Sequence, residues 1–228
     1  MHNTVRLTSP LQIAAWAGIA SSITVFAVIP LYFVHDGPPP ADNVFTRCLI
    51  TLFTAAFLLA FFSGFAHLIR RQGNDHEWSA SLFWGTSLLY VGFILLGAAH
   101  EAGVAFNAPG VDDPTIDGLL ADANILVHGS IKRILTAILL LTAAFAIRST
   151  RMLPNWLASA SAAIAVVNLA FVPSIYFGKC PTAFYSAIGW GNTALTGSLI
   201  TYWIIAASIA MLSAVRTGQP HLRIHADT

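Results

Sequence analysis

Long, uninterrupted runs of apolar residues dominate the pattern of this chain. Six such runs cover residues 11–34, 48–69, 79–99, 124–147, 155–177 and 191–215. An α-helix needs roughly 20 apolar residues to cross the hydrocarbon core of a bilayer, and each run reaches that length. The runs also lack the two-residue alternation that is typical of membrane β-barrel strands. The pattern therefore predicts an all-α integral membrane bundle of six transmembrane helices, forming one domain over residues 1–228.

Composition supports a membrane environment. Hydrophobic residues make up 56% of the chain and charged residues only 9%, whereas a soluble domain carries about 25% charged residues. A surface this poor in charge suits lipid better than water. The net charge of +1 supplies no basic field for nucleic acid. We therefore expect a multi-pass protein of the cell membrane whose main partner is membrane lipid.

The basic residues between the runs are distributed unevenly. One side of the predicted membrane receives Arg6, Arg70, Arg71, Arg148, Arg151, Arg216 and Arg223. The other side receives Arg47 and Lys179. Because loops rich in Lys and Arg stay in the cytoplasm, this distribution predicts that the N-terminus and the C-terminus are both cytoplasmic.

A regularly spaced set of polar residues interrupts the fourth run. Every fourth position is polar: Asn124, His128, Lys132 and Thr136. On an α-helix these positions form one stripe, and Arg133 lies beside it. A cation deep in hydrocarbon costs at least about 2.5 kcal/mol on insertion scales. We therefore expect the two cations to face the bundle interior and to meet a negative charge there.

The end of the third run offers a carboxylate close to this stripe. Tyr90, Gly97 and Glu101 share one helix face, and the glycine between the two polar residues leaves room for another group to approach. The fifth run adds an amide that can point inward. The predicted polar site, in the outer half of the bundle, contains Tyr90, His100, Glu101, Asn124, His128, Lys132, Arg133 and Asn168.

Several functions are compatible with such a site. Lys132 and Arg133 suit an anionic group, with His128 and Glu101 as a candidate catalytic acid–base pair. This reading describes a membrane-embedded enzyme or binding protein for a lipophilic or amphiphilic small molecule. Alternatively, the cations are the selectivity element of a small transporter or channel subunit. A purely structural ion pair of Lys132 or Arg133 with Glu101 also explains the pattern.

Metal and haem chemistry stay open as further alternatives. His100, Glu101 and His128 are residue types that bind zinc or iron, and His100 with His128 could be axial haem ligands. The chain contains no phosphate-binding loop, dinucleotide fingerprint or His-Glu-x-x-His motif, so no cofactor is identified from the sequence.

Two cysteines fall on the same predicted side of the membrane. Cys48 lies at the outer end of the second run and Cys180 in the last outer loop. That side is the oxidising one, where disulfides persist, so a Cys48–Cys180 bridge is a candidate, with two free thiols as the alternative. The sequence leaves oligomerisation open.

One short segment resembles a known group of proteins. The stretch Arg148-Ser-Thr-Arg151-Met-Leu-Pro154-Asn-Trp156-Leu157 resembles the connection between the fourth and fifth helices in small bacterial six-span integral membrane proteins of unknown function. Arginines there face the cytoplasm and the proline starts a helix. The resemblance implies the six-span architecture and no activity; the expected location is the bacterial inner (plasma) membrane.

Overall fold

The computed structural model describes residues 10–35, 37–107, 109–115 and 121–216. All regular elements in these ranges are helical. The first half of the chain forms α1 (Pro10–Val28), η1 (Ile29–Tyr32), α2 (Ala41–Arg70), η2 (Asn74–His76) and α3 (Glu77–Asn107). The second half forms α4 (Ala121–Leu126), η3 (Val127–Ile131), α5 (Lys132–Thr150), α6 (Asn155–Phe171), η4 (Val172–Phe177), η5 (Gly191–Leu195) and α7 (Thr196–Arg216).

These elements join into six helices that are long and apolar enough to cross a membrane. The predicted number and type of helices are thereby confirmed. We call the segment made of α4, η3 and α5 the fourth span; it is kinked at Gly129, whose backbone is not helical (φ −88°, ψ −115°). The helices extend beyond the apolar runs, because α2 begins at Ala41 and α3 continues to Asn107. Pro40, with an extended backbone, directly precedes α2, and prolines commonly mark such helix starts.

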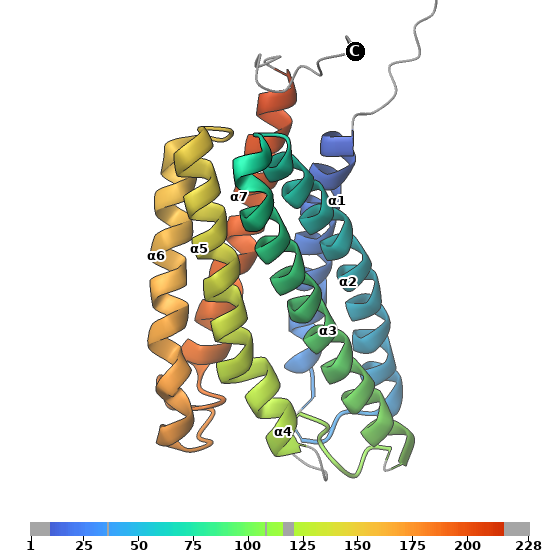
Figure 1. Ribbon diagram of the computed structural model, residues 1–228. Coiled ribbons are helices and arrows are strands. Elements are labelled where there is room, and N and C mark those ends of the chain that lie inside the picture. Colours follow the sequence, from blue (N-terminus) through green and yellow to red (C-terminus); the bar gives the residue numbers. More distant parts are fainter. Residues whose placement is uncertain (1–9, 36, 108, 116–120, 217–228) are drawn as a thin grey trace, which may run out of the picture.

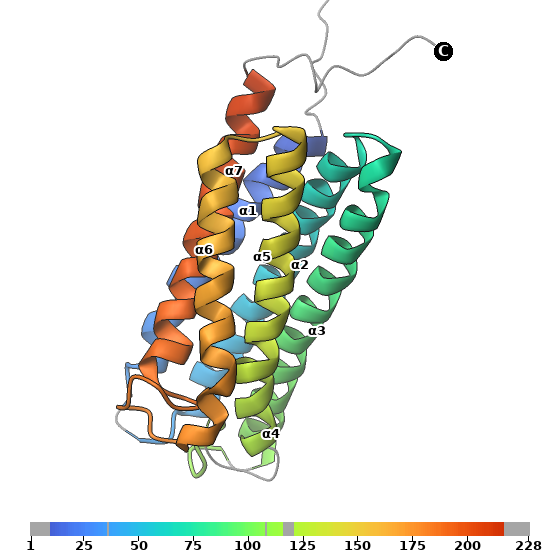
Figure 2. The same ribbon diagram turned by 60° about the vertical axis from the view of Figure 1, so that its left-hand side comes forward.

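The six helices pack as a ring in chain order. α1 contacts α2, α2 contacts α3, α3 contacts α5, α5 contacts α6, α6 contacts α7, and α7 returns to α1. Figures 1 and 2 show this arrangement, with the start of α1, the end of α7 and the α2–α3 and α5–α6 connections at one end. We call this the arginine-rich end, after Arg70, Arg71, Arg148, Arg151 and Arg216. Arg6 and Arg223 lie outside the described residues.

Aromatic side chains fill the interior of the half nearer the arginine-rich end. Phe61 and Phe65 of α2, Phe83 of α3 and Trp203 of α7 are all buried. Phe65 stacks on Phe83 with ring centroids 4.8 Å apart, and Trp203 packs on Phe65 at 5.6 Å. The Trp203 Nε1–H donates a hydrogen bond to the Ser161 hydroxyl at 2.7 Å, so its polar atom is satisfied. The two halves of the bundle therefore differ: this one is apolar and tightly packed.

Small residues allow α1 to approach two neighbours closely. A Cβ atom added to Gly18 would overlap the Ser208 hydroxyl of α7 and lie 2.6 Å from the Phe61 ring of α2. Ala14 occupies a similar position against Gly64 of α2. The small-residue face of α1 is thus a packing surface, as is common between membrane helices.

Irregular helix geometry is concentrated in the other half of the bundle. η3 and η5 are π-helical turns and η4 is a 3₁₀ turn that contains Pro173. η3 contacts both η4 and η5, and side chains complete the backbone hydrogen bonding there. Ser130 donates to the Val172 carbonyl at 2.8 Å, and Asn192 donates to the Ala187 carbonyl at 2.8 Å. Irregular backbone is tolerated at membrane depth when it is buried in protein.

Candidate functional site

Polar side chains in the half opposite the arginine-rich end form two clusters rather than one. The Glu101 cluster consists of Tyr32, Arg47 and Glu101, and joins η1, α2 and α3. The cationic cluster consists of Tyr90, His128, Lys132, Arg133 and Asn168, and joins α3, the fourth span and α6. α3 contributes to both clusters and separates them.

The Glu101 cluster is a buried ion pair covered by a tyrosine. The Arg47 guanidinium lies 3.4 Å from the Glu101 carboxylate, and the two side chains are 3% and 10% exposed. The Tyr32 hydroxyl donates to Glu101 Oε1 at 3.2 Å. The Tyr32 ring lies over the guanidinium, with its centroid 4.1 Å from the Arg47 Cζ. Charge, hydrogen bond and cation–π contact therefore act on the same carboxylate–guanidinium pair.

The partner of Glu101 differs from the sequence prediction. We expected Glu101 to meet Lys132 or Arg133, and Arg47 to lie in a loop. Because α2 begins at Ala41, Arg47 is already in the second turn of a helix and points at α3. Glu101 is bonded to Tyr32 and ion-paired with Arg47, and among the described residues it makes no hydrogen bond with His128. The prolines before α2 could have indicated this arrangement from the sequence, because a helix that starts directly after them includes Arg47 and places it inside the bundle.

The cationic cluster holds two neighbouring cations in the bundle interior. Lys132 is half-buried, and its Nζ lies 5.0 Å from the centroid of the Tyr90 ring. Arg133 is 4% exposed and donates from Nη2 to the His128 carbonyl at 2.8 Å and from Nη1 to Asn168 Oδ1 at 3.4 Å. Lys132 is the first residue of α5 and follows the kinked turn η3. Lys132, Arg133 and Asn168 therefore all face the interior of the bundle, as their positions in the sequence predicted.

The π-helical turn η3 explains why Arg133 turns back toward His128. In a regular α-helix the amide of residue 132 would donate to the carbonyl of residue 128. Here the Lys132 amide donates to the Gly129 carbonyl instead. The His128 carbonyl accepts from the Arg133 guanidinium. Part of the role of Arg133 is thus to satisfy a backbone group at the irregular turn.

His128 packs directly on Gly97 of α3. A Cβ atom added to Gly97 would overlap the His128 ring and lie 3.1 Å from Asn124 Oδ1. The glycine therefore creates the space that both side chains occupy, as its position on α3 predicted. The His128 Nδ1 lies 3.2 Å from the Asn124 carbonyl. Since a carbonyl accepts only, Nδ1 carries the proton in this contact and Nε2 remains an acceptor in the neutral ring.

Three polar atoms of the cationic cluster have no hydrogen-bond partner among the described residues. They are the Lys132 Nζ, the Tyr90 hydroxyl and the His128 Nε2, and none of them is fully enclosed by protein. The Arg133 Nε is different, because it is both enclosed and unpartnered. The unpartnered polar groups of the cationic cluster are thus an ammonium, a hydroxyl and an imidazole nitrogen.

The residues proposed as metal ligands do not come together as a set of three in the described part of the chain. Within the described parts of the chain, no group of three His, Cys, Asp or Glu side chains lies close enough to hold a metal ion. His100 has an enclosed, unpartnered Nε2 and lies one turn beyond Gly97 on α3.

The candidate disulfide is absent, and both cysteines are free thiols. The Cys48 thiol donates to the Ala98 carbonyl of α3 at 3.3 Å. Cys180 is exposed in the segment after η4, with its sulfur 3.2 Å from the Thr182 hydroxyl. α2 and α6 lie on opposite sides of the ring, which keeps the two residues apart. The Thr182 hydrogen bond, together with backbone amides, lowers the pKa of the Cys180 thiol.

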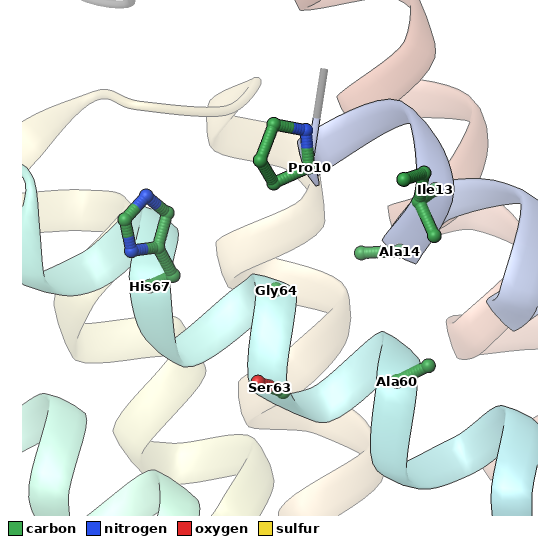
Figure 3. A pocket seen from close by; sticks show the side chains of 7 residues that line it. All are labelled: Pro10, Ile13, Ala14, Ala60, Ser63, Gly64 and His67. Carbon is green, nitrogen blue, oxygen red and sulfur yellow. The ribbon is translucent and has the colours of Figure 1, made fainter. Parts of the chain in front are cut away.

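An open groove lies far from both clusters, at the arginine-rich end between α1 and α2 (Figure 3). Its volume is about 360 Å³, and it is lined by Pro10, Ile13, Ala14, Ala60, Ser63, Gly64 and His67. The walls are mostly apolar and His67 is the one titratable lining group. The groove contains none of the predicted site residues, so the chemistry of the chain is concentrated elsewhere.

No protein-family model, curated protein or solved structure matches this chain. Similarity to known proteins therefore assigns neither a family nor an activity. The guide to function is the chemistry of the two clusters, of which the Glu101 cluster is internally neutral and the cationic cluster is not.

Proposed function

We propose that this chain is a membrane-embedded binding protein or enzyme for an amphiphilic molecule whose anionic group is held by Lys132 and Arg133. The molecule reaches the cationic cluster from the half of the bundle opposite the arginine-rich end. In this proposal the protein spans the bacterial inner membrane six times, with both termini cytoplasmic. The arginines gathered at one end of the helices support that orientation.

One observation carries the proposal: the two interior cations lack a carboxylate partner. The ion pairs that join described residues use Arg47, Arg70 and Lys179. Lys132 and Arg133 instead contact an aromatic ring, a backbone carbonyl and a neutral amide. Charges within a membrane segment are costly unless paired. The anionic group of a bound molecule would supply the missing counter-charge.

The surroundings of the cluster suit an amphiphile. Leu96 of α3 and Ile131 and Ile134 of the fourth span are exposed, which offers apolar contact to a hydrocarbon tail that stays in the lipid phase. The aromatic side chains in the other half of the bundle leave no evident polar route across it, so binding or catalysis is favoured over transport. If the protein is an enzyme, His128 is the candidate base, because its Nε2 is an available acceptor beside the bound group.

A binding experiment tests the proposal. The full chain, in nanodiscs of zwitterionic lipid, is titrated with palmitate and with hexadecanol, which share a hydrocarbon tail and differ in charge. We expect palmitate to bind more tightly, and Lys132→Met to weaken its binding about tenfold or more, because a charge-assisted hydrogen bond is removed while the apolar stem remains.

The matched control is Lys179→Met. Lys179 is a solvent-exposed lysine near the same end of the bundle and pairs with Asp122, so its removal leaves palmitate affinity unchanged. Equal affinity for palmitate and hexadecanol, or full palmitate affinity in Lys132→Met, would contradict the proposal.

A further inference from the structure

The charge of the cationic cluster is greater than a single monoanion can neutralise. Lys132 and Arg133 contribute two positive charges, and their contacts with Tyr90, Asn168 and the His128 carbonyl are all with neutral groups. The nearby ion pair of Arg47 and Glu101 sums to zero. A carboxylate or a phosphodiester brings one negative charge, whereas a phosphate monoester carries about 1.5 to 2 at neutral pH. Full compensation in the low-dielectric interior therefore favours the monoester.

The unpartnered donors of the cluster come from three side chains on two helices, which suits a group with three acceptor oxygens. A lysine ammonium has three N–H donors and a tyrosine one O–H. Neither Lys132 nor Tyr90 uses these donors within the described residues, and the enclosed Arg133 Nε–H also lacks an acceptor. A carboxylate offers two oxygens, while a phosphate monoester offers three terminal oxygens arranged around one phosphorus atom. Donor geometry and charge thus point to the same group.

We infer that the anionic group bound by Lys132 and Arg133 is a phosphate monoester at the polar end of a lipophilic molecule. Lys132 makes the direct contact, Arg133 supplies the second positive charge, and the Tyr90 hydroxyl donates to a further oxygen. The inference rests on the proposed function, since it specifies the chemistry of the same site.

The test compares four probes that share one tail. Hexadecyl phosphate, hexadecyl methyl phosphate, palmitate and hexadecanol are titrated into the full chain in phosphatidylcholine nanodiscs at pH 7, where the monoester carries about 1.5 to 2 negative charges. We expect hexadecyl phosphate to bind at least about tenfold more tightly than the methyl ester and palmitate. Inorganic phosphate is added as a competitor. Failure to displace hexadecyl phosphate at similar concentration supports the lipophilic ligand, whereas displacement would overturn that part of the inference and assign a soluble phosphate.

Two variants separate binding chemistry from structural roles. Lys132→Met leaves one cation, so the ratio of the affinities for hexadecyl phosphate and for its methyl ester should fall to about one. Arg133→Lys keeps the second charge and should retain that preference even if the loss of its bonds to His128 and Asn168 lowers stability. The ratio of the two affinities, rather than either affinity alone, is the readout, because a folding defect would not change it selectively.

The outcomes distinguish the two proposals. If palmitate binds as tightly as hexadecyl phosphate, or if Lys132→Met keeps the monoester preference, the inference of a phosphate monoester is wrong while the anionic site stands. If no anionic probe binds more tightly than hexadecanol, the proposed function fails together with it.

Discussion

At the residue scale, the Glu101 cluster shows how a buried charge is made tolerable. The carboxylate has an ion-pair partner in Arg47 and a hydrogen-bond donor in Tyr32, whose ring also covers the Arg47 guanidinium. The distance of 3.4 Å between Arg47 Nη2 and Glu101 Oε2 is nevertheless longer than a charge-assisted hydrogen bond. The Arg47 Nε and Nη2 atoms make no hydrogen bond with described residues. Charge compensation, more than hydrogen bonding, therefore holds Arg47 and Glu101 together.

Removing one partner of this pair should cost more than removing both. Arg47→Met leaves Glu101 as an unpaired buried carboxylate, and we expect a loss of about 3–5 kcal/mol in unfolding free energy. The double variant Arg47→Met with Glu101→Met should recover much of that loss. Unfolding in detergent, followed by circular dichroism, measures both. A double variant less stable than Arg47→Met would show that the pair is not held together by charge compensation.

The cationic cluster also shows which residues a linear pattern can place. The four-residue stripe correctly indicated that Lys132 faces the bundle interior, because helical periodicity decides which residues share a face. It gave no information on Arg133 bonding back to His128, which depends on the π-helical turn. The turn is kinked at Gly129 and packs against η4 and η5, but a glycine in the sequence does not specify which side chain will bond to the freed carbonyl.

At the element scale, contact between α3 and the fourth span depends on Gly97. The glycine makes room for the His128 ring, which would otherwise overlap a side chain there. Because the two helices approach closely, the Lys132 ammonium contacts the face of the Tyr90 ring, and residues of both helices form the cationic cluster.

Gly97→Ala should therefore disturb both stability and binding. Because the added methyl group overlaps a ring in a packed interface, we expect a loss of about 1–3 kcal/mol and a weaker affinity for hexadecyl phosphate. Gly92→Ala on the same helix is the matched control, since its Cβ would meet no atom within 4 Å; an alanine there should be neutral or slightly stabilising. Equal thermal stability of the two variants would show that the His128–Gly97 contact does not set the helix spacing.

At the scale of the whole molecule, the ring of six helices has two unlike halves. One half is filled by aromatic side chains, and the other contains the two polar clusters and the irregular turns η3, η4 and η5. The proposed ligand would therefore reach its site from the half that contains the polar clusters.

The free cysteines report the orientation of the whole molecule. With the arginine-rich end in the cytoplasm, a membrane-impermeant maleimide added to intact cells should label Cys180, which is exposed. Its lowered pKa increases the thiolate fraction at neutral pH, so labelling should be faster than for an ordinary thiol of pKa about 8.5. Cys180→Ser should abolish the label, because Cys48 packs against α3. Labelling only after the cells are opened would reverse the proposed topology.

The sequence alone determined the six helices, their approximate bounds and the inward face that carries Lys132, because length, hydropathy and helical period are local properties of the chain. Only the tertiary structure decided which cation Glu101 meets, since the pairing depends on where α2 begins and on how it is rotated toward α3. The separation of Cys48 from Cys180 likewise follows from the order of helices around the ring. Contacts between residues far apart in the chain are set by packing, and a linear pattern does not specify them.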